Sequence, residues 1–103
     1  MPKDEWNTGA TRNSIGSVRY DLLEWDFIKD MGEVMGEGLL SHGKNNWKGG
    51  VPKAIVINHL LEHLRKHLDE DTEELHLAKI AVNAMMLDYY IRMGLDIKET
   101  PNE

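Results

Sequence analysis

The stretch from Leu75 to Ile91 constrains the fold more than any other part of the sequence, because it is apolar on almost every side when wound as a helix. A helix that is apolar all round must be buried. A chain of 103 residues with only two other helices has little with which to cover it. We therefore expect an all-α helical bundle that is completed by oligomerisation, as a homodimer or a higher homo-oligomer. The apolar residues of this stretch are Leu75, Leu77, Ala78, Ile80, Ala81, Val82, Ala84, Met85, Met86, Leu87, Tyr89, Tyr90 and Ile91.

Two further helices are predicted before this stretch. The first is expected over residues 21–41, where Asp21 and Glu24 have the spacing of a capping box and apolar residues follow at helical intervals. A loop rich in Gly and Asn comes next. The second helix is expected over residues 52–68, with Pro52 in its first turn.

The third helix is predicted over residues 72–93, behind a second capping box formed by Asp71 and Glu74. No run of residues alternates in the way that a β-strand does, so no strand is expected. Three regions follow from these boundaries. They are a mobile N-terminal arm over residues 1–17, a single all-α domain over residues 18–94 and a C-terminal tail over residues 95–103.

Composition excludes several classes of protein. Hydrophobic residues make up 41% of the chain and charged residues 29%, which is typical of a globular domain rather than a disordered or membrane-spanning one. Cysteine is absent, so disulfides and thiolate metal sites are excluded. The net charge of −6 disfavours binding to a nucleic-acid polymer. The N-terminal residues lack an apolar signal core, and we expect a cytoplasmic protein that does not bind membranes.

A row of carboxylates lies along one edge of the first predicted helix. Asp26, Asp30, Glu33 and Glu37 are spaced by four, three and four residues, so each lies one turn from the next. Like charges at this spacing repel one another, and no Lys or Arg lies within the row. Either solvent and salt neutralise a purely exposed acidic face, or these oxygens hold a hard divalent cation such as Mg²⁺ or Mn²⁺.

The second predicted helix carries the pattern H-x-x-E-H from His59 to His63. This pattern occurs in zinc proteases, but the chain is far too small for such a fold, and a polar helix face is the favoured interpretation. His59 itself lies where the helix is apolar nearly all round, so we expect its ring to be buried. The apolar stripe of this helix consists of Ala54, Ile57, Leu61, Leu64 and Leu68.

The third predicted helix carries one line of polar residues through its apolar surface. Glu73, His76 and Asn83 share this line at spacings of three and seven residues. Because polar groups in a buried helix need partners, the line either ties the core together or faces a ligand.

Taken together, several segments resemble a small phage-encoded family, the dATP/dGTP diphosphohydrolase N-terminal domain. The segment 19–22 (RYDL) opens the resemblance, and residues 38–47 (GLLSHGKNNW) are similar to its G-A-x-K-Y-G-x-x-N-W element. His59 falls where an Arg-His pair is usual. Residues 69–84 resemble its D-x-E-S-G-x-x-H-x-x-H-x-x-x-N-A element. The resemblance covers roughly residues 19–90.

The chain also departs from this pattern at several positions. Ser41 and His42 stand where Lys and Tyr are usual, Asn58 stands in place of Arg, and Lys79 stands in place of a second His. Residues 71–73 (DTE) replace the Glu-Ser-Gly turn. The changes at Ser41 and Asn58 remove possible contacts to phosphate, which bears on catalysis more than on the fold.

The resemblance implies hydrolysis of a (deoxy)nucleoside triphosphate, with a purine deoxynucleotide favoured, to the monophosphate and pyrophosphate. Like the related MazG-type pyrophosphohydrolases, the protein would use Mg²⁺ or Mn²⁺ held by helix carboxylates. The catalytic residues implied are Glu33 and Glu37, and the implied metal ligands are Glu33, Glu37, Glu62 and Asp69. The implied nucleotide-binding residues are Lys44, Asn46, Trp47, Lys48, His59, His76 and Asn83. Trp47 either stacks on the base or fills the junction between helices.

Three functions therefore compete. The first is a metal-dependent nucleotide pyrophosphohydrolase acting in phage nucleotide metabolism, in the cytoplasm of an infected bacterium. The second is a non-catalytic protein that binds or sequesters a nucleotide or a nucleotide-derived signal. The third is a structural helical oligomer whose acidic row is only solvated.

Overall fold

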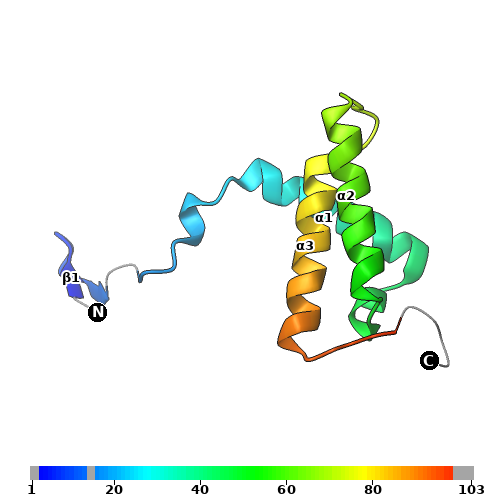
Figure 1. Ribbon diagram of the computed structural model, residues 1–103. Coiled ribbons are helices and arrows are strands. Elements are labelled where there is room, and N and C mark those ends of the chain that lie inside the picture. Colours follow the sequence, from blue (N-terminus) through cyan, green and yellow to red (C-terminus); the bar gives the residue numbers. More distant parts are fainter. Residues whose placement is uncertain (1–2, 14–15, 99–103) are drawn as a thin grey trace.

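The computed structural model describes residues 3–13 and 16–98 and confirms the all-α prediction (Figure 1). The three α-helices of the described part are α1 (Trp25–His42), α2 (Lys53–Leu68) and α3 (His76–Arg92). Short 3₁₀ turns precede α1 and α2, namely η1 (Tyr20–Leu22) and η2 (Asn46–Gly49). None of the helices in this part of the chain has the length and hydropathy that a membrane span requires.

The start of α1 lies four residues later than predicted, because Asp21 does not cap a helix. Its carboxylate instead accepts two hydrogen bonds from Arg19, one from Nε at 2.9 Å and one from Nη2 at 2.7 Å. The residue that precedes α1 is Glu24, which makes no side-chain capping bond. The predicted capping box of Asp21 with Glu24 is therefore wrong.

The start of α3 is also later than predicted, for a similar reason. Asp71 Oδ1 accepts a hydrogen bond from the backbone N–H of Glu73 at 2.9 Å, which closes a local turn instead of a helix terminus. The helix begins only at His76, after Leu75, so the capping box of Asp71 with Glu74 is wrong as well. The prediction for α2 holds to within one residue.

The N-terminal segment contains a small β-hairpin that the sequence did not predict. Strands β1 (Lys3–Glu5) and β2 (Thr11–Asn13) pair in antiparallel fashion, with Glu5 opposite Thr11. Two strands of three residues are too short for an alternating pattern to be visible. The hairpin extends away from the helices (Figure 1). Accordingly, the radius of gyration is 19.1 Å, whereas a compact domain of this length has about 13 Å.

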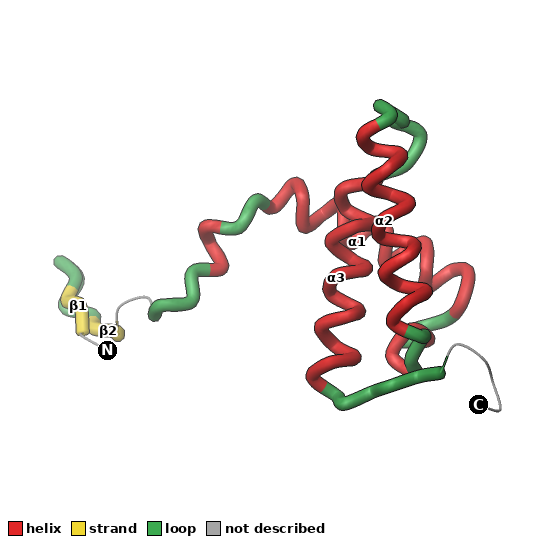
Figure 2. The backbone as a smooth tube through the Cα atoms, viewed as in Figure 1, coloured by secondary structure: helices red, strands yellow, loops and turns green. Residues whose placement is uncertain are grey.

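The helix α3 is the central element of the fold. It packs against both α1 and α2 and also contacts the η2 turn, whereas α1 and α2 make at most marginal contact with each other. Figure 2 shows α2 and α3 running side by side with α1 crossing behind them. Four of the five fully buried residues in the described part of the chain belong to α3, and the fifth belongs to α2. They are His76, Ala78, Val82, Tyr90 and Val56.

Part of the apolar surface of the helices is exposed in the single chain. On α3, Leu77 is 50% exposed and Ile91 is 66% exposed, so this helix is not covered on every side. On α2, the face that packs runs through Val56, and the predicted apolar stripe lies outside it. Leu61 is 53% exposed and Leu68 is 71% exposed.

One hydrogen bond and one close contact fasten the loop between α1 and α2 to the rest of the fold. The Tyr90 hydroxyl donates to the backbone carbonyl of Trp47 at 2.6 Å, and only 1% of Tyr90 is exposed. Burial raises the pKa of this phenol. Gly50 has a φ of 107°, and a Cβ there would lie 2.8 Å from Ile97 Cγ1. Glycine thus lets the C-terminal segment pass close to the loop.

We predict that Tyr90→Phe lowers the free energy of unfolding by about 1–2 kcal/mol, because the carbonyl of Trp47 loses its donor in a partly buried place. Urea denaturation followed by circular dichroism measures this change. Tyr89→Phe is the matched control on the neighbouring residue and should alter stability by a smaller amount. Equal losses in the two variants would contradict a specific role for the Tyr90 hydrogen bond.

Candidate functional site

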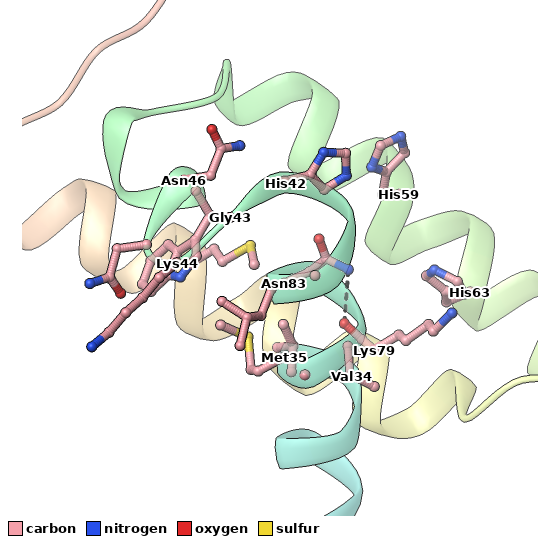
Figure 3. A pocket seen from close by; sticks show the side chains of 17 residues that line it. Val34, Met35, His42, Gly43, Lys44, Asn46, His59, His63, Lys79 and Asn83 are labelled. Carbon is pink, nitrogen blue, oxygen red and sulfur yellow. Dashed lines mark hydrogen bonds between the residues drawn. The ribbon is translucent and has the colours of Figure 1, made fainter.

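A pocket of about 780 Å³ opens between α1, the η2 loop, α2 and α3 (Figure 3). Sites for small molecules usually have 300–1,000 Å³, so the volume suits a ligand of nucleotide size. Its lining comes from all three helices and from the loop that Tyr90 fastens. The lining residues are Val34, Met35, Gly36, Gly38, Leu39, His42, Gly43, Lys44, Asn45, Asn46, Trp47, His59, His63, Lys79, Val82, Asn83 and Met86.

The polar side chains of the pocket favour an anionic ligand. Two lysines and three histidines contribute to the lining, whereas none of the residues that line it carries a carboxylate. Figure 3 shows His59 and His63 of α2 along one side and Lys44 on the opposite side. The positive charge of the lining comes from Lys44 and from Lys79, and Lys79 is paired with Glu74 outside the lining. Such a lining favours negative charge, and its apolar side chains provide a surface for a flat, weakly polar group.

Five of the seven predicted nucleotide-binding residues line this pocket. They are Lys44, Asn46, Trp47, His59 and Asn83. Lys48 lies outside the lining, with its Nζ 5.6 Å from the ring centroids of both Trp47 and Tyr89. His76 also lies outside the lining and is buried, with 3% of its surface exposed. The prediction that His59 is buried is wrong, because the buried face of α2 passes through Val56 and leaves His59 exposed.

Trp47 has a structural contact and borders the pocket at the same time. Its ring packs edge-on against Tyr89, with the centroids 5.0 Å apart and an angle of 69° between the planes. The indole is therefore held at the junction of the loop with α3, and it contributes to the pocket lining. Both predicted roles, base stacking and filling the junction, are compatible with this position.

Two other features shape the pocket wall. Asn83 Nδ2 donates to the backbone carbonyl of Lys79 at 2.8 Å, which orients the amide group (Figure 3). Gly36 and Gly38 line the α1 side, and a Cβ at either position would meet no atom within 4 Å. Close packing within the described part of the chain therefore does not explain these two glycines, and at their positions the α1 side of the pocket carries no side chain.

The four predicted metal-binding carboxylates lie outside the pocket lining. Glu33 and Glu37 are exposed on α1, and Glu33 accepts a hydrogen bond from Lys29 at 2.9 Å, so a base beside the acidic row offsets part of its charge. Glu62 and Asp69 both pair with Arg65, at 2.6 Å and 3.0 Å. Among residues 3–13 and 16–98, these four carboxylates do not converge into a group of metal ligands.

A different cluster does converge, at the place where α2 passes the start of α3. His63, Glu74 and His76 each offer a ligand atom, and these atoms lie within 4.8 Å of one another. The two Nδ1 atoms of the histidines are 2.9 Å apart. The sequence analysis singled out His76, which lies in the polar line of the third helix, and did not predict His63 or Glu74 as members of a site. The available signal for His63 was the H-x-x-E-H pattern, but Glu62 of that pattern points elsewhere and pairs with Arg65.

Neighbouring groups shift the pKa values within this cluster. Burial lowers the pKa of His63, and the nearby Lys79, His76 and Lys66 lower it further, while Glu74 opposes them. The hydrogen bond from Lys79 lowers the pKa of Glu74. A neutral imidazole beside an ionised carboxylate is the favoured state at neutral pH.

The lowered pKa of His63 predicts a pH-dependent stability of the metal-free protein. Below its ordinary pKa of about 6.5, the unfolded chain takes up a proton that the folded chain resists. The contribution of neutral His63 to the stability of the fold is therefore complete above that pH, and it is lost as the pH falls below it. Urea denaturation in the presence of EDTA, repeated from pH 7.5 to pH 5, measures the free energy of unfolding at each pH. We expect this free energy to fall less steeply with falling pH in His63→Asn than in the wild type. His59→Asn, which replaces an exposed ring, should keep the pH dependence of the wild type. A weaker pH dependence in His59→Asn and not in His63→Asn would contradict the assignment of this dependence to His63.

Comparison with known protein families gives a match over most of the chain. Residues 7–99 match the family described as dATP/dGTP diphosphohydrolase, N-terminal, which is 93 of the 103 residues. No curated protein and no solved structure matches the chain. The elements that carry the earlier resemblance, from the segment before α1 to Asn83 on α3, all lie inside the matched range. The chain belongs to the dATP/dGTP diphosphohydrolase N-terminal family.

Proposed function

We propose that this protein hydrolyses a (deoxy)nucleoside triphosphate to the monophosphate and pyrophosphate in a metal-dependent reaction, with a purine deoxynucleotide as the favoured substrate. The observation that carries this proposal is the pocket, which combines apolar walls with five basic side chains and has no carboxylate in its lining. Membership of a diphosphohydrolase family supports a nucleotide as its ligand.

In this proposal, the two chemically different parts of a nucleotide meet different parts of the pocket. The base lies against the apolar side chains and the half-buried Trp47. The basic side chains of the lining, among them Lys44, Lys79 and His59, are the proposed contacts of the phosphates. Asn83, whose amide is held by the carbonyl of Lys79, offers a directional contact to the base or the sugar.

The metal ion that the family implies fits α1 only in part. Glu33 and Glu37 lie one turn apart and are exposed, and Mg²⁺ typically binds through one or two carboxylates, with phosphate oxygens and water as its other ligands. When bound, such an ion neutralises the charge of the phosphates. Glu62 and Asp69 remain predicted ligands, although in this chain both are engaged by Arg65.

In this proposal, the carboxylates of α1 act from outside the pocket lining. Glu37 lies between Gly36 and Gly38, both of which line the pocket, so its backbone borders the pocket wall. A carboxylate there is suited to orient an attacking water and to accept its proton. Glu33, one turn earlier, would have to release Lys29 to contribute.

One observation favours a second candidate, a protein that binds a nucleotide without hydrolysing it. No carboxylate lines the pocket, and the basic residues alone are sufficient to hold phosphates. The position of His42 in the lining, where the family pattern has Tyr, is consistent with altered chemistry at the phosphate end.

We predict that the purified protein releases pyrophosphate from at least one member of a panel of dNTPs and NTPs when Mg²⁺ or Mn²⁺ is present, and that EDTA abolishes the release. Glu33→Ala/Glu37→Ala should reduce turnover by about 10²-fold or more if these residues act as proposed. Glu70→Ala, an exposed acid outside the pocket, is the matched control.

Calorimetric binding of the same panel distinguishes the candidates. If a nucleotide binds without being hydrolysed, and Lys44→Ala weakens its binding, the function is sequestration and not hydrolysis. The absence of both turnover and binding would refute the two nucleotide functions and leave the structural oligomer.

We further propose that the protein forms a homodimer or a higher homo-oligomer. The apolar stripe of α2 supports this, because its members are exposed in the single chain and lie on one face of a helix. Exposed apolar faces of this kind mark protein interfaces. The exposed residues of α3, including Leu77, add to the apolar surface that a second copy would cover.

Leu61→Glu places a charge in the middle of the α2 stripe, where Leu61 is 53% exposed. We predict that it shifts the protein to a monomer, because a charge without a partner is costly to bury in an apolar interface. Light scattering after size-exclusion chromatography measures the mass. Leu40→Glu, at an 89% exposed position on α1, is the control and should leave the mass unchanged. A monomeric wild type, or an equal effect of both changes, would contradict the proposed interface.

A further inference from the structure

The cluster of His63, Glu74 and His76 is not explained by the proposed nucleotide chemistry, and it combines groups from separate parts of the chain. His63 comes from α2, Glu74 from the turn before α3, and His76 from the first position of α3. The histidine rings lie with their centroids 5.2 Å apart and an angle of 40° between their planes. The packing of α2 against α3 therefore sets the geometry of the group.

The contact between the two histidines joins two atoms that can each act as a donor or as an acceptor. Their Nδ1 atoms are 2.9 Å apart, and a neutral imidazole carries a proton on only one of its nitrogens. One Nδ1 must donate to the other, or two lone pairs face each other. A cation between them accepts both lone pairs at once and lets both Nε2 atoms carry protons.

His76 provides a second, independent observation. It is 3% exposed, and its buried Nε2 has no hydrogen-bond partner with suitable geometry among the described residues. The nearest acid is Asp71, whose Oδ2 lies 3.3 Å from that Nε2 but is not oriented as a hydrogen-bond acceptor. Histidine ligands of metals usually donate the other ring N–H to a carboxylate, and Asp71 is the acid nearest to this Nε2.

We propose that His63, Glu74 and His76 form a binding site for a transition-metal ion of the Zn²⁺ type. Zn–N bonds of about 2.0–2.1 Å at a tetrahedral angle separate two nitrogens by about 3.3 Å. The observed 2.9 Å between the Nδ1 atoms requires only a small outward movement of one ring. Two imidazoles and one carboxylate suit Zn²⁺, whereas Mg²⁺ prefers oxygen ligands alone.

The site has a natural competitor in Lys79. This residue donates to Glu74 Oε1 at 2.5 Å, and Lys66 lies 3.8 Å from Oε2. An ion must displace one of these ammonium groups from the carboxylate, which is 36% exposed. Removing the charge of Lys79 therefore strengthens binding of the ion.

Three protein ligands leave a fourth position open on the ion. His63 also lines the pocket, as does Lys79, and Figure 3 shows the two side chains next to each other at its edge. The proposed ion thus lies at the border of the pocket. Its binding requires neither a nucleotide nor Glu33 and Glu37.

The test is isothermal titration calorimetry of the full chain with Zn²⁺, after dialysis against EDTA and without affinity-tag histidines. We expect one Zn²⁺ per chain, no competition from millimolar Mg²⁺, and at least about tenfold weaker binding in His63→Ala and in Glu74→Gln. His67→Ala, one turn along α2 and outside the cluster, should bind as the wild type does. Circular dichroism establishes that each variant is folded.

Lys79→Met should bind Zn²⁺ more tightly than the wild type does. The proposal is overturned if the wild type does not bind Zn²⁺, if His63→Ala binds it unchanged, or if His67→Ala loses binding equally. If Lys79→Met binds Zn²⁺ and the wild type does not, the proposal is also overturned. In that case Lys79, and not a metal ion, neutralises Glu74 in the natural protein. Because no nucleotide is present, these outcomes are independent of whether the protein hydrolyses one.

Discussion

The packing of α3 is the constraint on which the other features of this protein depend. This helix contacts α1, α2 and the η2 turn, whereas α1 and α2 hardly touch each other. The pocket therefore forms between α1 and α2, which both pack against α3 and hardly contact each other. Its floor includes Val82 and Asn83 of α3, and its rim belongs to the loop that Tyr90 holds by a hydrogen bond.

Charge is distributed unevenly around that space. The side chains that line the pocket are basic or neutral, while the acidic residues that give the chain its net charge of −6 lie elsewhere. Many of these acids are already paired with bases on the surface, as Glu33 is with Lys29 and Glu62 is with Arg65. Such exposed pairs contribute little to stability, so a cation or a second chain can rearrange them at small cost.

The sequence predicted the type and order of the helices because apolar periodicity is repeated over many residues. The predicted starts of α1 and α3 were wrong, because one short side chain decides where each helix begins. Asp21 pairs with Arg19 and Asp71 closes a turn, and spacing alone cannot distinguish these contacts from a cap. The face of α2 that packs was also not predictable. Val56 and Leu61 are both apolar, and only the position of α3 decides which of the two is buried.

The candidate site was predicted in part for the same reason. Residues of the Asn-Trp loop and Asn83 belong to family motifs, so the resemblance selected them directly. The pairing of His63 with His76 joins two helices across 13 positions, and no local pattern announces it. His59 and His63 look equivalent on a helical projection. The structure separates them, since His63 faces α3 and is part-buried while His59 is exposed.

The hydrogen bond from Tyr90 to the carbonyl of Trp47 spans 43 positions, and it has a consequence for how the protein is made. A ribosome delivers the chain from its N-terminus, so α1, the loop and α2 emerge before the end of α3. Until Tyr90 has emerged, the loop lacks the hydrogen bond that fastens it to α3. The rim of the pocket therefore gains this anchor only after most of α3 has been made.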